Sequence, residues 1–157
     1  MSIDADGSPH AYNPQDTGLD YLANAGRNGN WWGLATDARG NPLIQGAQDP
    51  APGYYVSTTS LTNAGFSNSD PRRYVNSETV AYIAIPPVLQ NYGARLGAIA
   101  LVTNTNNGIT SEAIVADIGP ANEIGEGSIM LADNLGIPSN PRTGGIASKT
   151  IEYKIYF

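Results

Sequence analysis

Two acidic residues nine positions apart carry the clearest chemical signal in the sequence. The apolar run 113–116 ends at Asp117, and Gly119-Pro120 then favours a turn, because glycine tolerates positive φ and proline fixes φ. Glu126 follows between two glycines. A loop that folds back brings both carboxylates to one cleft, where one acid can protonate a leaving oxygen while the other activates water or attacks a carbon. This is the chemistry of glycosidic-bond hydrolysis.

The neighbouring residues predict which elements carry the two acids. Residues 109–116 predict a strand that ends in Asp117, and residues 128–135 predict a short helix that Gly136 ends. Glu126 then lies at the start of this helix, where the helix dipole favours the charged form and suits a base. Burial at the end of an apolar strand suits Asp117 to be the acid. The alternative is a solvated turn and a capped helix without chemistry.

Further motifs accompany the two acids along nearly the whole chain. These are Asp4-Ala5-Asp6-Gly7 with Tyr12, Gly29-Asn30-Trp31-Trp32, residues 49–60, residues 73–78, Asp117-Ile118-Gly119-Pro120, residues 124–128 and residues 140–145. Together they resemble the family 75 glycoside hydrolases, the chitosanases first described in fungi. The resemblance runs from about Ile3 to the C-terminus. The combination is specific, although no single motif would be.

The resemblance implies an endo-chitosanase that hydrolyses the β-1,4 bonds of chitosan or chito-oligosaccharides with inversion at the anomeric carbon. The family's two essential acids correspond to Asp117 and Glu126. The resemblance also implies a six-stranded double-psi β-barrel and no metal or organic cofactor. Inversion predicts carboxyl groups roughly 6.5–9.5 Å apart, which leaves room for a water molecule.

Other polar and aromatic side chains are candidates to bind the sugar chain. Acids would pair with substrate amines, and aromatic rings would stack on sugar faces. The predicted substrate-binding residues are Asp4, Asp6, Tyr12, Trp31, Trp32, Asp37, Tyr55, Ser57, Thr59, Glu78 and Arg142, and Glu123 is a further candidate partner for an amine. For the two tryptophans core packing is the alternative, and for Ser57 and Thr59 it is an exposed strand face.

The composition bounds the class of partner. Charged residues make up 14% of the chain and its net charge is −6, with only 8 lysines and arginines. Nucleic acid is therefore not an expected partner, because phosphate binding requires clustered lysine and arginine. An acidic surface suits a cationic polymer such as chitosan.

The chain contains no cysteine, which excludes disulfides, thiolate zinc sites and a cysteine nucleophile. No apolar stretch is long enough for a membrane-spanning helix, so no membrane partner is expected. The start of the chain shows no signal peptide, and we expect a secreted, monomeric protein whose leader is absent from this sequence. A length of 157 residues predicts a single catalytic domain over residues 1–157.

Short apolar and β-branched runs between turn residues predict a mainly β fold with two or three short helices. Strands are expected over residues 31–36, 54–61, 79–85, 96–103, 109–116 and 150–157, and another short helix over residues 17–26. With 18 glycines and 11 prolines, this pattern favours a closed or nearly closed β-barrel of double-psi type whose last strand closes the sheet.

Two other functions stay open. The same acid pair could act on another aminosugar glycan, such as peptidoglycan. Alternatively, the chain is a non-catalytic carbohydrate-binding module that stacks sugars on Trp31, Trp32 and tyrosines, although a binding module does not need two acids poised for chemistry.

Overall fold

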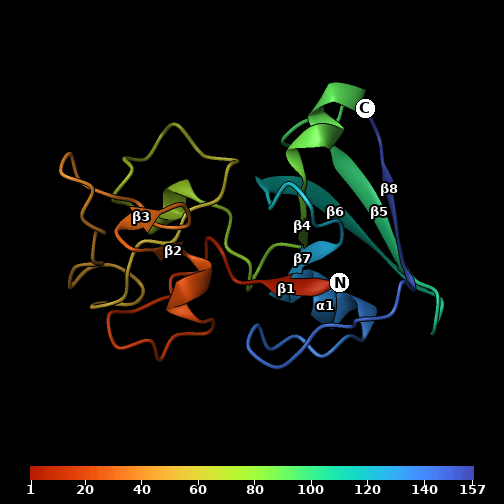
Figure 1. Cartoon of the computed structure of the whole chain (residues 1–157), viewed down its shortest axis with the longest axis horizontal. Coiled ribbons are helices and arrows are strands. Elements are labelled where there is room, and N and C mark those ends of the chain that lie inside the picture. Colours follow the sequence, from red (N-terminus) through yellow and green to blue (C-terminus); the bar gives the residue numbers. More distant parts are fainter. The chain divides into compact units, whose positions relative to one another are not determined.

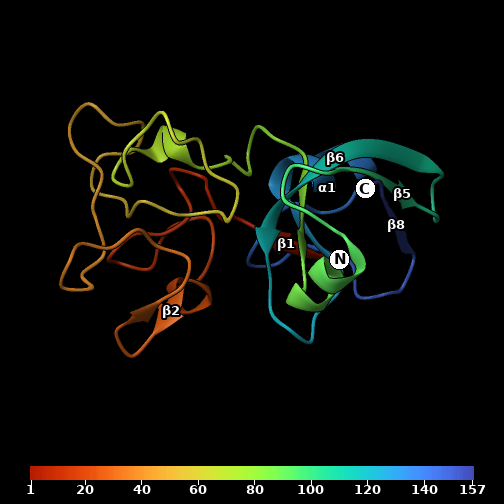
Figure 2. The ribbon, with the colours of Figure 1, turned by 90° about the horizontal axis from the view of Figure 1, so that it is seen from above.

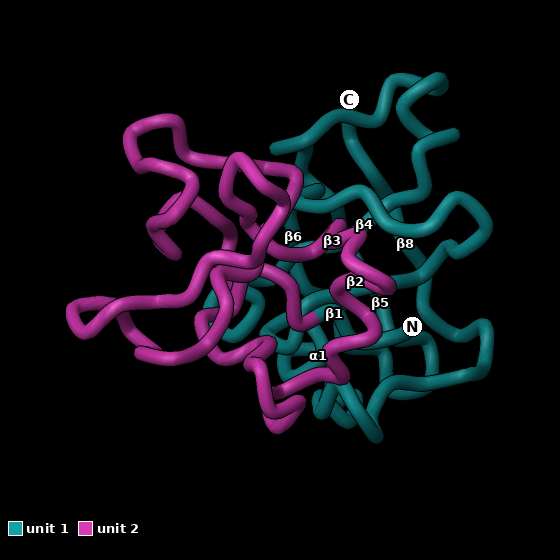
Figure 3. Tube along the Cα trace, turned by 60° about the vertical axis from the view of Figure 1, so that its left-hand side comes forward, with its two compact units in different colours: residues 1–4, 77–157 teal, residues 5–76 magenta.

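The computed structural model describes all 157 residues and divides the chain into two compact units (Figure 3). Unit 1 comprises Met1–Asp4 and Ser77–Phe157, and unit 2 comprises Ala5–Asn76. The single catalytic domain over residues 1–157 stays a prediction.

Unit 1 is built on a six-stranded sheet (Figure 1). In spatial order its strands are β1 (Ser2–Asp4), β7 (Glu126–Ser128), β4 (Tyr82–Ile85), β6 (Ile109–Ile118), β5 (Ile99–Asn104) and β8 (Ile151–Ile155). β1 is parallel to β7 and β4 is parallel to β6, whereas the other neighbours are antiparallel. The sheet therefore places β4 between β6 and β7, the two strands that carry the predicted catalytic acids.

One face of this sheet carries the apolar core of unit 1. Ile3, Ile83 and Val115 point to this face from β1, β4 and β6, and all three belong to one buried cluster. Because side chains alternate along a strand, the neighbours of these residues point to the opposite face. Burial of the apolar cluster removes surface from water and supplies the main stabilisation of the unit.

A single α-helix, α1 (Ile129–Leu135), packs against this core through Leu131 and Leu135. The Ser128 hydroxyl accepts a hydrogen bond from the Leu131 amide at 3.1 Å and caps the first turn. Gly136 adopts φ of 68° and ends the helix. The predicted helix over residues 128–135 is confirmed.

The mainly β class is confirmed, but no sheet closes into a barrel. The order of strands begins at β1 and ends at β8, so the last strand forms a margin of the sheet instead of closing it. Ile3 of β1 nevertheless belongs to the same core as Ile151 and Ile155 of β8. The sheet therefore curves around a shared core, and Figure 2 shows the arc of β6.

Unit 2 has little regular secondary structure. It holds a two-stranded hairpin, β2 (Gly26–Arg27) and β3 (Asn30–Trp31), and two 3-10 helices, η1 (Leu22–Asn24) and η2 (Pro71–Arg73); a third, η3 (Pro87–Tyr92), belongs to unit 1. Strands were expected over residues 31–36 and 54–61. Beyond β3, these segments form only isolated bridges, such as Leu34 with Ser57.

The helix expected over residues 17–26 is reduced to η1. The amides of Leu19 and Asp20 bond to the carbonyls of His10 and Ala11, so they are not available to a helix. The Asp20 side chain accepts from the amide of Tyr21, which further favours a turn over a helix. These contacts outweigh the local helical pattern.

Buried polar side chains connect the loops of unit 2. Gln45 is buried, and its amide nitrogen donates to the carbonyls of Pro9 at 2.7 Å and Tyr55 at 3.1 Å. The Gln45 side-chain oxygen accepts from the amide of Ala51 at 3.0 Å. One side chain thus satisfies three backbone groups in two segments, and these bonds take the place of the hydrogen bonds that paired strands would supply.

Among the helices of the whole chain, none has the length and apolar character needed to cross a membrane.

Candidate active site

The two predicted catalytic acids lie on the strands that flank β4. Ala84 of β4 has Asp117 of β6 as its register partner on one side and Glu126 of β7 on the other. Register partners on neighbouring strands point to the same face of a sheet. Asp117 and Glu126 therefore share the face opposite the apolar core, with one strand between them.

A register shift next to Asp117 determines which face that residue occupies. Ile83 pairs with Val115, but Ala84 pairs with Asp117, so Ala116 is an extra residue in β6. Without this bulge, Asp117 would alternate onto the same face as Val115 and point into the core. Bulges often re-aim a side chain beside an active site. Here the bulge turns the carboxylate away from the apolar core.

The sequence predicted that Glu126 lies at the start of the helix, but the structure places it in a strand. It begins the strand β7, and no acidic residue lies in the first turn of α1. The helix dipole therefore gives no reason to assign Glu126 as the base. Asp117 occupies the end of a long strand, as expected.

Gly119 makes room for the side chain of Glu126. A Cβ built on Gly119 would lie 2.6 Å from Oε2 of Glu126 and 3.7 Å from the Cβ of Ala84. The amide of Gly119 donates to the carbonyl of Ile85 at 2.9 Å, which holds the turn against β4. The Glu126 carboxylate thus occupies the space that any larger residue at position 119 would fill.

A second carboxylate of unit 1 lies close to Asp117. Carboxylate oxygens of Asp4 and Asp117 approach within 4.8 Å of each other. Asp4 is 6% exposed and Asp117 is 8% exposed. Two acids at this spacing repel each other when both are charged, so the pair favours a proton or a cationic group. They could contribute to holding a metal ion, but two carboxylates alone define no metal site, and the absence of metals and cofactors stays a prediction.

Tyr153 of β8 packs against the apolar core and ends beside Gly125. Its hydroxyl lies 3.4 Å from the position that a Cβ on Gly125 would take. Burial, and secondly the negative charge of Glu126, raise the pKa of Tyr153 well above its usual value. The hydroxyl therefore stays protonated at neutral pH.

Two other predicted substrate-binding residues belong to unit 1. Glu78 is half-buried between Ser77 and β4. Arg142 is half-buried in the loop that follows α1, where its amide donates to the side chain of Asn140 at 2.8 Å. Glu123 is exposed in the loop that precedes β7. Their roles in substrate binding stay predictions.

In unit 2, Asp6 and Tyr12 form a short hydrogen bond. The hydroxyl of the buried Tyr12 donates to Oδ1 of Asp6 at 2.6 Å, and Oδ2 of the buried Asp20 lies 3.5 Å from the same hydroxyl. A hydroxyl has one proton to donate, so Asp6 is its acceptor. This interaction orients the Asp6 carboxylate.

Ser57 and Thr59 are buried, and both hydroxyls bond to the backbone. The Ser57 hydroxyl accepts from the amide of Gly7 at 3.0 Å. The Thr59 hydroxyl accepts from the amide of Val75 at 3.0 Å and donates to the carbonyl of Leu61 at 2.7 Å. Neither residue lies on an exposed strand face, and both hold loops together.

The aromatic candidates of unit 2 differ in exposure. Trp32 is 62% exposed, and its ring nitrogen donates to the carbonyl of Asn24 at 2.8 Å. Trp31 is half-buried against Gly26 and lies 6.3 Å from the ring of Tyr55, with the two planes tilted by 40°. Trp31 is thus the more buried of the two tryptophans, and their roles in sugar binding stay predictions.

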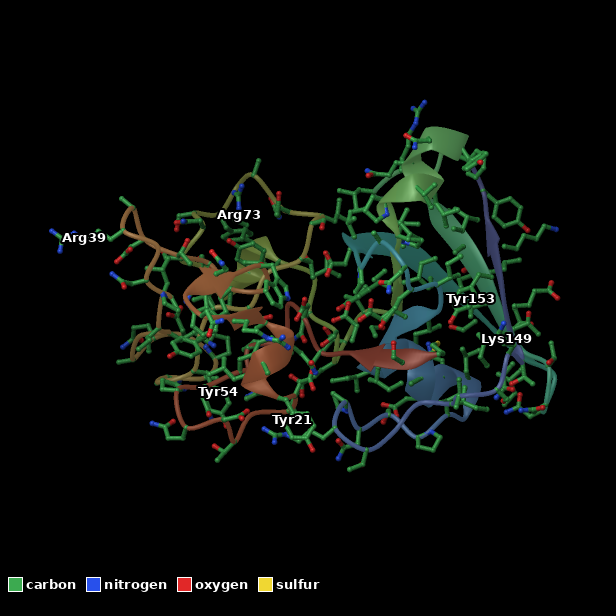
Figure 4. The ribbon with its side chains drawn as sticks, in the orientation of Figure 1. Tyr21, Arg39, Tyr54, Arg73, Lys149 and Tyr153 are labelled. Carbon is green, nitrogen blue, oxygen red and sulfur yellow. The ribbon has the colours of Figure 1, made fainter.

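Asp37 is exposed and forms the turn that precedes Pro42. Its Oδ1 accepts from the amides of Arg39 at 2.8 Å and Asn41 at 2.9 Å. The hydrogen bond from the Asn41 amide is the main reason that the pKa of Asp37 is lowered. Arg39 projects from this turn (Figure 4).

Sequence reasoning missed three parts of the site. The strand β1, which positions Asp4, is only three residues long and has no alternating pattern. The closeness of Gly119 to Glu126 depends on the sheet register, and the closeness of Tyr153 to Gly125 depends on the curvature of the sheet. The only signal in the sequence was Gly119-Pro120, which predicted a turn but not that the Glu126 carboxylate lies against it.

No family model matches this chain, and no curated protein matches it either. Function is therefore inferred from the site geometry and from the motifs of the sequence.

Proposed function

We propose that this protein is an endo-chitosanase that uses Asp117 and Glu126 in an inverting hydrolysis of β-1,4 glycosidic bonds. The observation that carries the proposal is the shared register partner: both acids flank Ala84 on the same face of the sheet. Two strands on either side of a third lie roughly 9–10 Å apart, Cα to Cα. This separation suits a pair of carboxyl groups with a water molecule between sugar and base.

In this mechanism Asp117 donates a proton to the leaving oxygen. Its low exposure and the nearby carboxylate of Asp4 favour a proton on this acid pair. Glu126 is more exposed and deprotonates the attacking water. The number of protons on the enzyme is unchanged, because Asp117 gives one proton to the leaving group and Glu126 takes one from water.

A cationic substrate fits the charge of the protein. The net charge of −6 attracts a polymer of protonated amines, and the pair of Asp4 and Asp117 favours a cationic group nearby. We expect added salt to weaken the binding of chitosan oligomers, because it screens these charges. Binding that is indifferent to salt would contradict recognition through amines.

The finer fold is also part of this proposal: we expect the curved sheet of unit 1 to belong to the double-psi barrel type. Core residues from both sheet margins, such as Ile3 and Ile155, support this expectation. The approach of Tyr153 on β8 to Gly125, directly before β7, supports it as well. Secretion and a monomeric state are further parts of the proposal.

The decisive experiment measures reducing ends released from fully deacetylated chitosan. We expect release by the parent protein and a loss of at least about 10²–10⁴-fold in Asp117→Asn and Glu126→Gln, the usual contribution of an acid or base. Both variants should keep the thermal unfolding midpoint of the parent. If the folded parent releases nothing from chitosan, the proposal fails.

The same assay on peptidoglycan tests whether the acid pair acts on another aminosugar glycan. A binding module without catalysis is favoured by one observation: Trp32 of unit 2 is exposed, and its chain neighbour Trp31 contacts the ring of Tyr55. Chitosan binding without any hydrolysis, lost in Trp32→Ala, would support that function instead.

A further inference from the structure

The chain contains two Asn-Gly pairs, Asn28-Gly29 and Asn107-Gly108, and both lie in exposed hairpin turns. An asparagine followed by glycine can lose its side-chain amide without an enzyme. The glycine nitrogen attacks the side-chain carbonyl carbon of the asparagine, and the missing Cβ of glycine leaves this approach unhindered. Because the two sites share the same pair of residues, any large difference in their reactivity comes from the fold.

Asn28-Gly29 forms the two-residue turn of the hairpin of unit 2, β2 and β3 (Figure 1). The φ angles of Asn28 and Gly29 are 54° and 80°, the left-handed values that a two-residue turn of type I′ requires. Neither the Asn28 side chain nor the Gly29 amide makes a hydrogen bond. A Cβ on Gly29 would have no atom within 4 Å. The attacking nitrogen and the carbon that it attacks are therefore both unrestrained.

Three hydrogen bonds restrain Asn107-Gly108 in unit 1. Nδ2 of Asn107 donates to the carbonyl of Leu135 at the end of α1 at 3.0 Å, and its Oδ1 accepts from the amide of Ile109 at 2.9 Å. The amide of Gly108 donates to the carbonyl of Asn104 at 2.8 Å. The nitrogen of Gly108 can attack Asn107 only after these bonds open, so local opening of the turn limits the reaction.

We propose that Asn28 is a site of spontaneous deamidation and that the fold protects Asn107 from the same reaction. The nitrogen of Gly29 forms a bond to Cγ of Asn28, and the bond from Cγ to Nδ2 breaks. Nδ2 leaves as ammonia with the proton of the Gly29 amide. Water then opens the five-membered succinimide to aspartate or isoaspartate, and the net charge of −6 becomes one unit more negative.

This modification alters the hairpin that holds Trp31. Trp31 pairs with Gly26, and a Cβ on Gly26 would clash with the Trp31 ring. Isoaspartate adds a carbon to the main chain of a turn that has only two residues, and the turn sets the register of a hairpin. Conversion of Asn28 to isoaspartate therefore shifts the pairing of β2 with β3 and moves the Trp31 ring.

The test follows both sites in one sample of the whole chain. The protein is incubated at mildly alkaline pH, and peptide mapping by mass spectrometry measures the converted fraction of Asn28 and of Asn107. We expect Asn28 to convert at least about 10-fold faster, because even one hydrogen bond to be opened at Asn107 lowers the reactive population by about that factor. In urea that unfolds the chain, the two sites should convert at similar rates.

Asn28→Gly is the matched control, because glycine also suits this turn and carries no amide to lose. Tryptophan fluorescence should drift during incubation of the parent and stay constant in Asn28→Gly. Equal rates at the two sites of the folded protein overturn the inference, and so does a difference of the same size in urea. The measurement uses no substrate, so a parent that is inactive on chitosan would refute the proposed function and leave this test intact.

Discussion

Unit 1 and unit 2 reach compact structures by different physical means. In unit 1, a sheet and one helix bury an apolar cluster, and the two catalytic candidates lie on strands. In unit 2, buried side chains such as Gln45, Tyr12 and Ser57 bond to loops that form almost no ladder. The first unit depends on apolar burial and register, and the second depends on individual polar contacts.

The two units hold their functional groups with different precision. The strand register fixes the relative position of Asp117 and Glu126, because both residues pair with Ala84 of β4. The loops of unit 2 present aromatic and polar groups, such as Trp32 and Asp37, without that constraint. Catalysis requires reacting groups held to a fraction of an ångström, whereas binding a polymer tolerates more variation.

The largest expected effect is on the apolar core of unit 1. Leu131 is fully buried on α1, so Leu131→Ala should lower the free energy of unfolding by about 2–5 kcal/mol. Chemical denaturation measures this change. Asp133→Ala, at an exposed position of the same helix, is the control and should change little. Equal effects of the two substitutions would refute the assignment of this core.

Gly119→Ala tests whether register alone positions the acids. The new Cβ would lie 2.6 Å from Oε2 of Glu126, so the carboxylate must move. We expect about a 10²-fold loss of kcat with the fold retained, because small displacements of a reacting group carry such costs. Gly46→Ala, where the nearest atom lies 3.8 Å away, should keep full activity. Full activity in Gly119→Ala would show that Glu126 lies elsewhere.

Gln45→Glu probes the polar contacts of unit 2. The substitution preserves the volume but removes both donors and places a carboxylate against the carbonyls of Pro9 and Tyr55. We expect a loss of roughly 1–3 kcal/mol in the free energy of unfolding at neutral pH. The loss should shrink in acid, where a protonated glutamate regains a donor. The exposed Gln48→Glu is the control, and a matching effect there would remove the distinction between buried and exposed contacts.

The smallest expected effect concerns an exposed ion pair of unit 2. The Arg72 side chain bonds Asp70 at 2.7 Å and, as the largest cause, lowers the pKa of Asp70. A lowered folded-state pKa stabilises the fold above the ordinary carboxyl pKa, and this contribution disappears as pH falls through the lowered value. Arg72→Ala should raise the Asp70 pKa, as measured by NMR titration, and barely change the unfolding midpoint at neutral pH. A large drop in the midpoint would contradict the view that only buried polar contacts hold unit 2.

Sequence patterns predicted much of unit 1 and little of unit 2. Alternation and apolar runs located β4, β5, β6 and β8, and the capping serine and terminal glycine located α1. The polar contacts of unit 2 are invisible to such patterns, because Ser57 and Thr59 look like strand residues until their hydroxyls are seen to bond Gly7 and Val75.

For the site, sequence identified the two acids as a pair but misplaced one of them. Glu126 was assigned to a helix start because glycines precede a helical pattern, whereas the pairing of β7 with β1 and β4 makes it a strand residue. The bulge at Ala116 has no sequence signature, since it arises from the pairing of β6 with β4. Both features depend on contacts between residues far apart in the chain.

If Asp117 and Glu126, separated by β4, act as acid and base, hydrolysis of a chitosan chain inverts the configuration at the anomeric carbon. Proton NMR of a chito-oligosaccharide during the first minutes of hydrolysis measures the configuration of the new reducing end directly. We expect the α-anomer to appear first and the β-anomer only later, by mutarotation. Initial release of the β-anomer would contradict it, because retention requires carboxyl groups only about 5–5.5 Å apart.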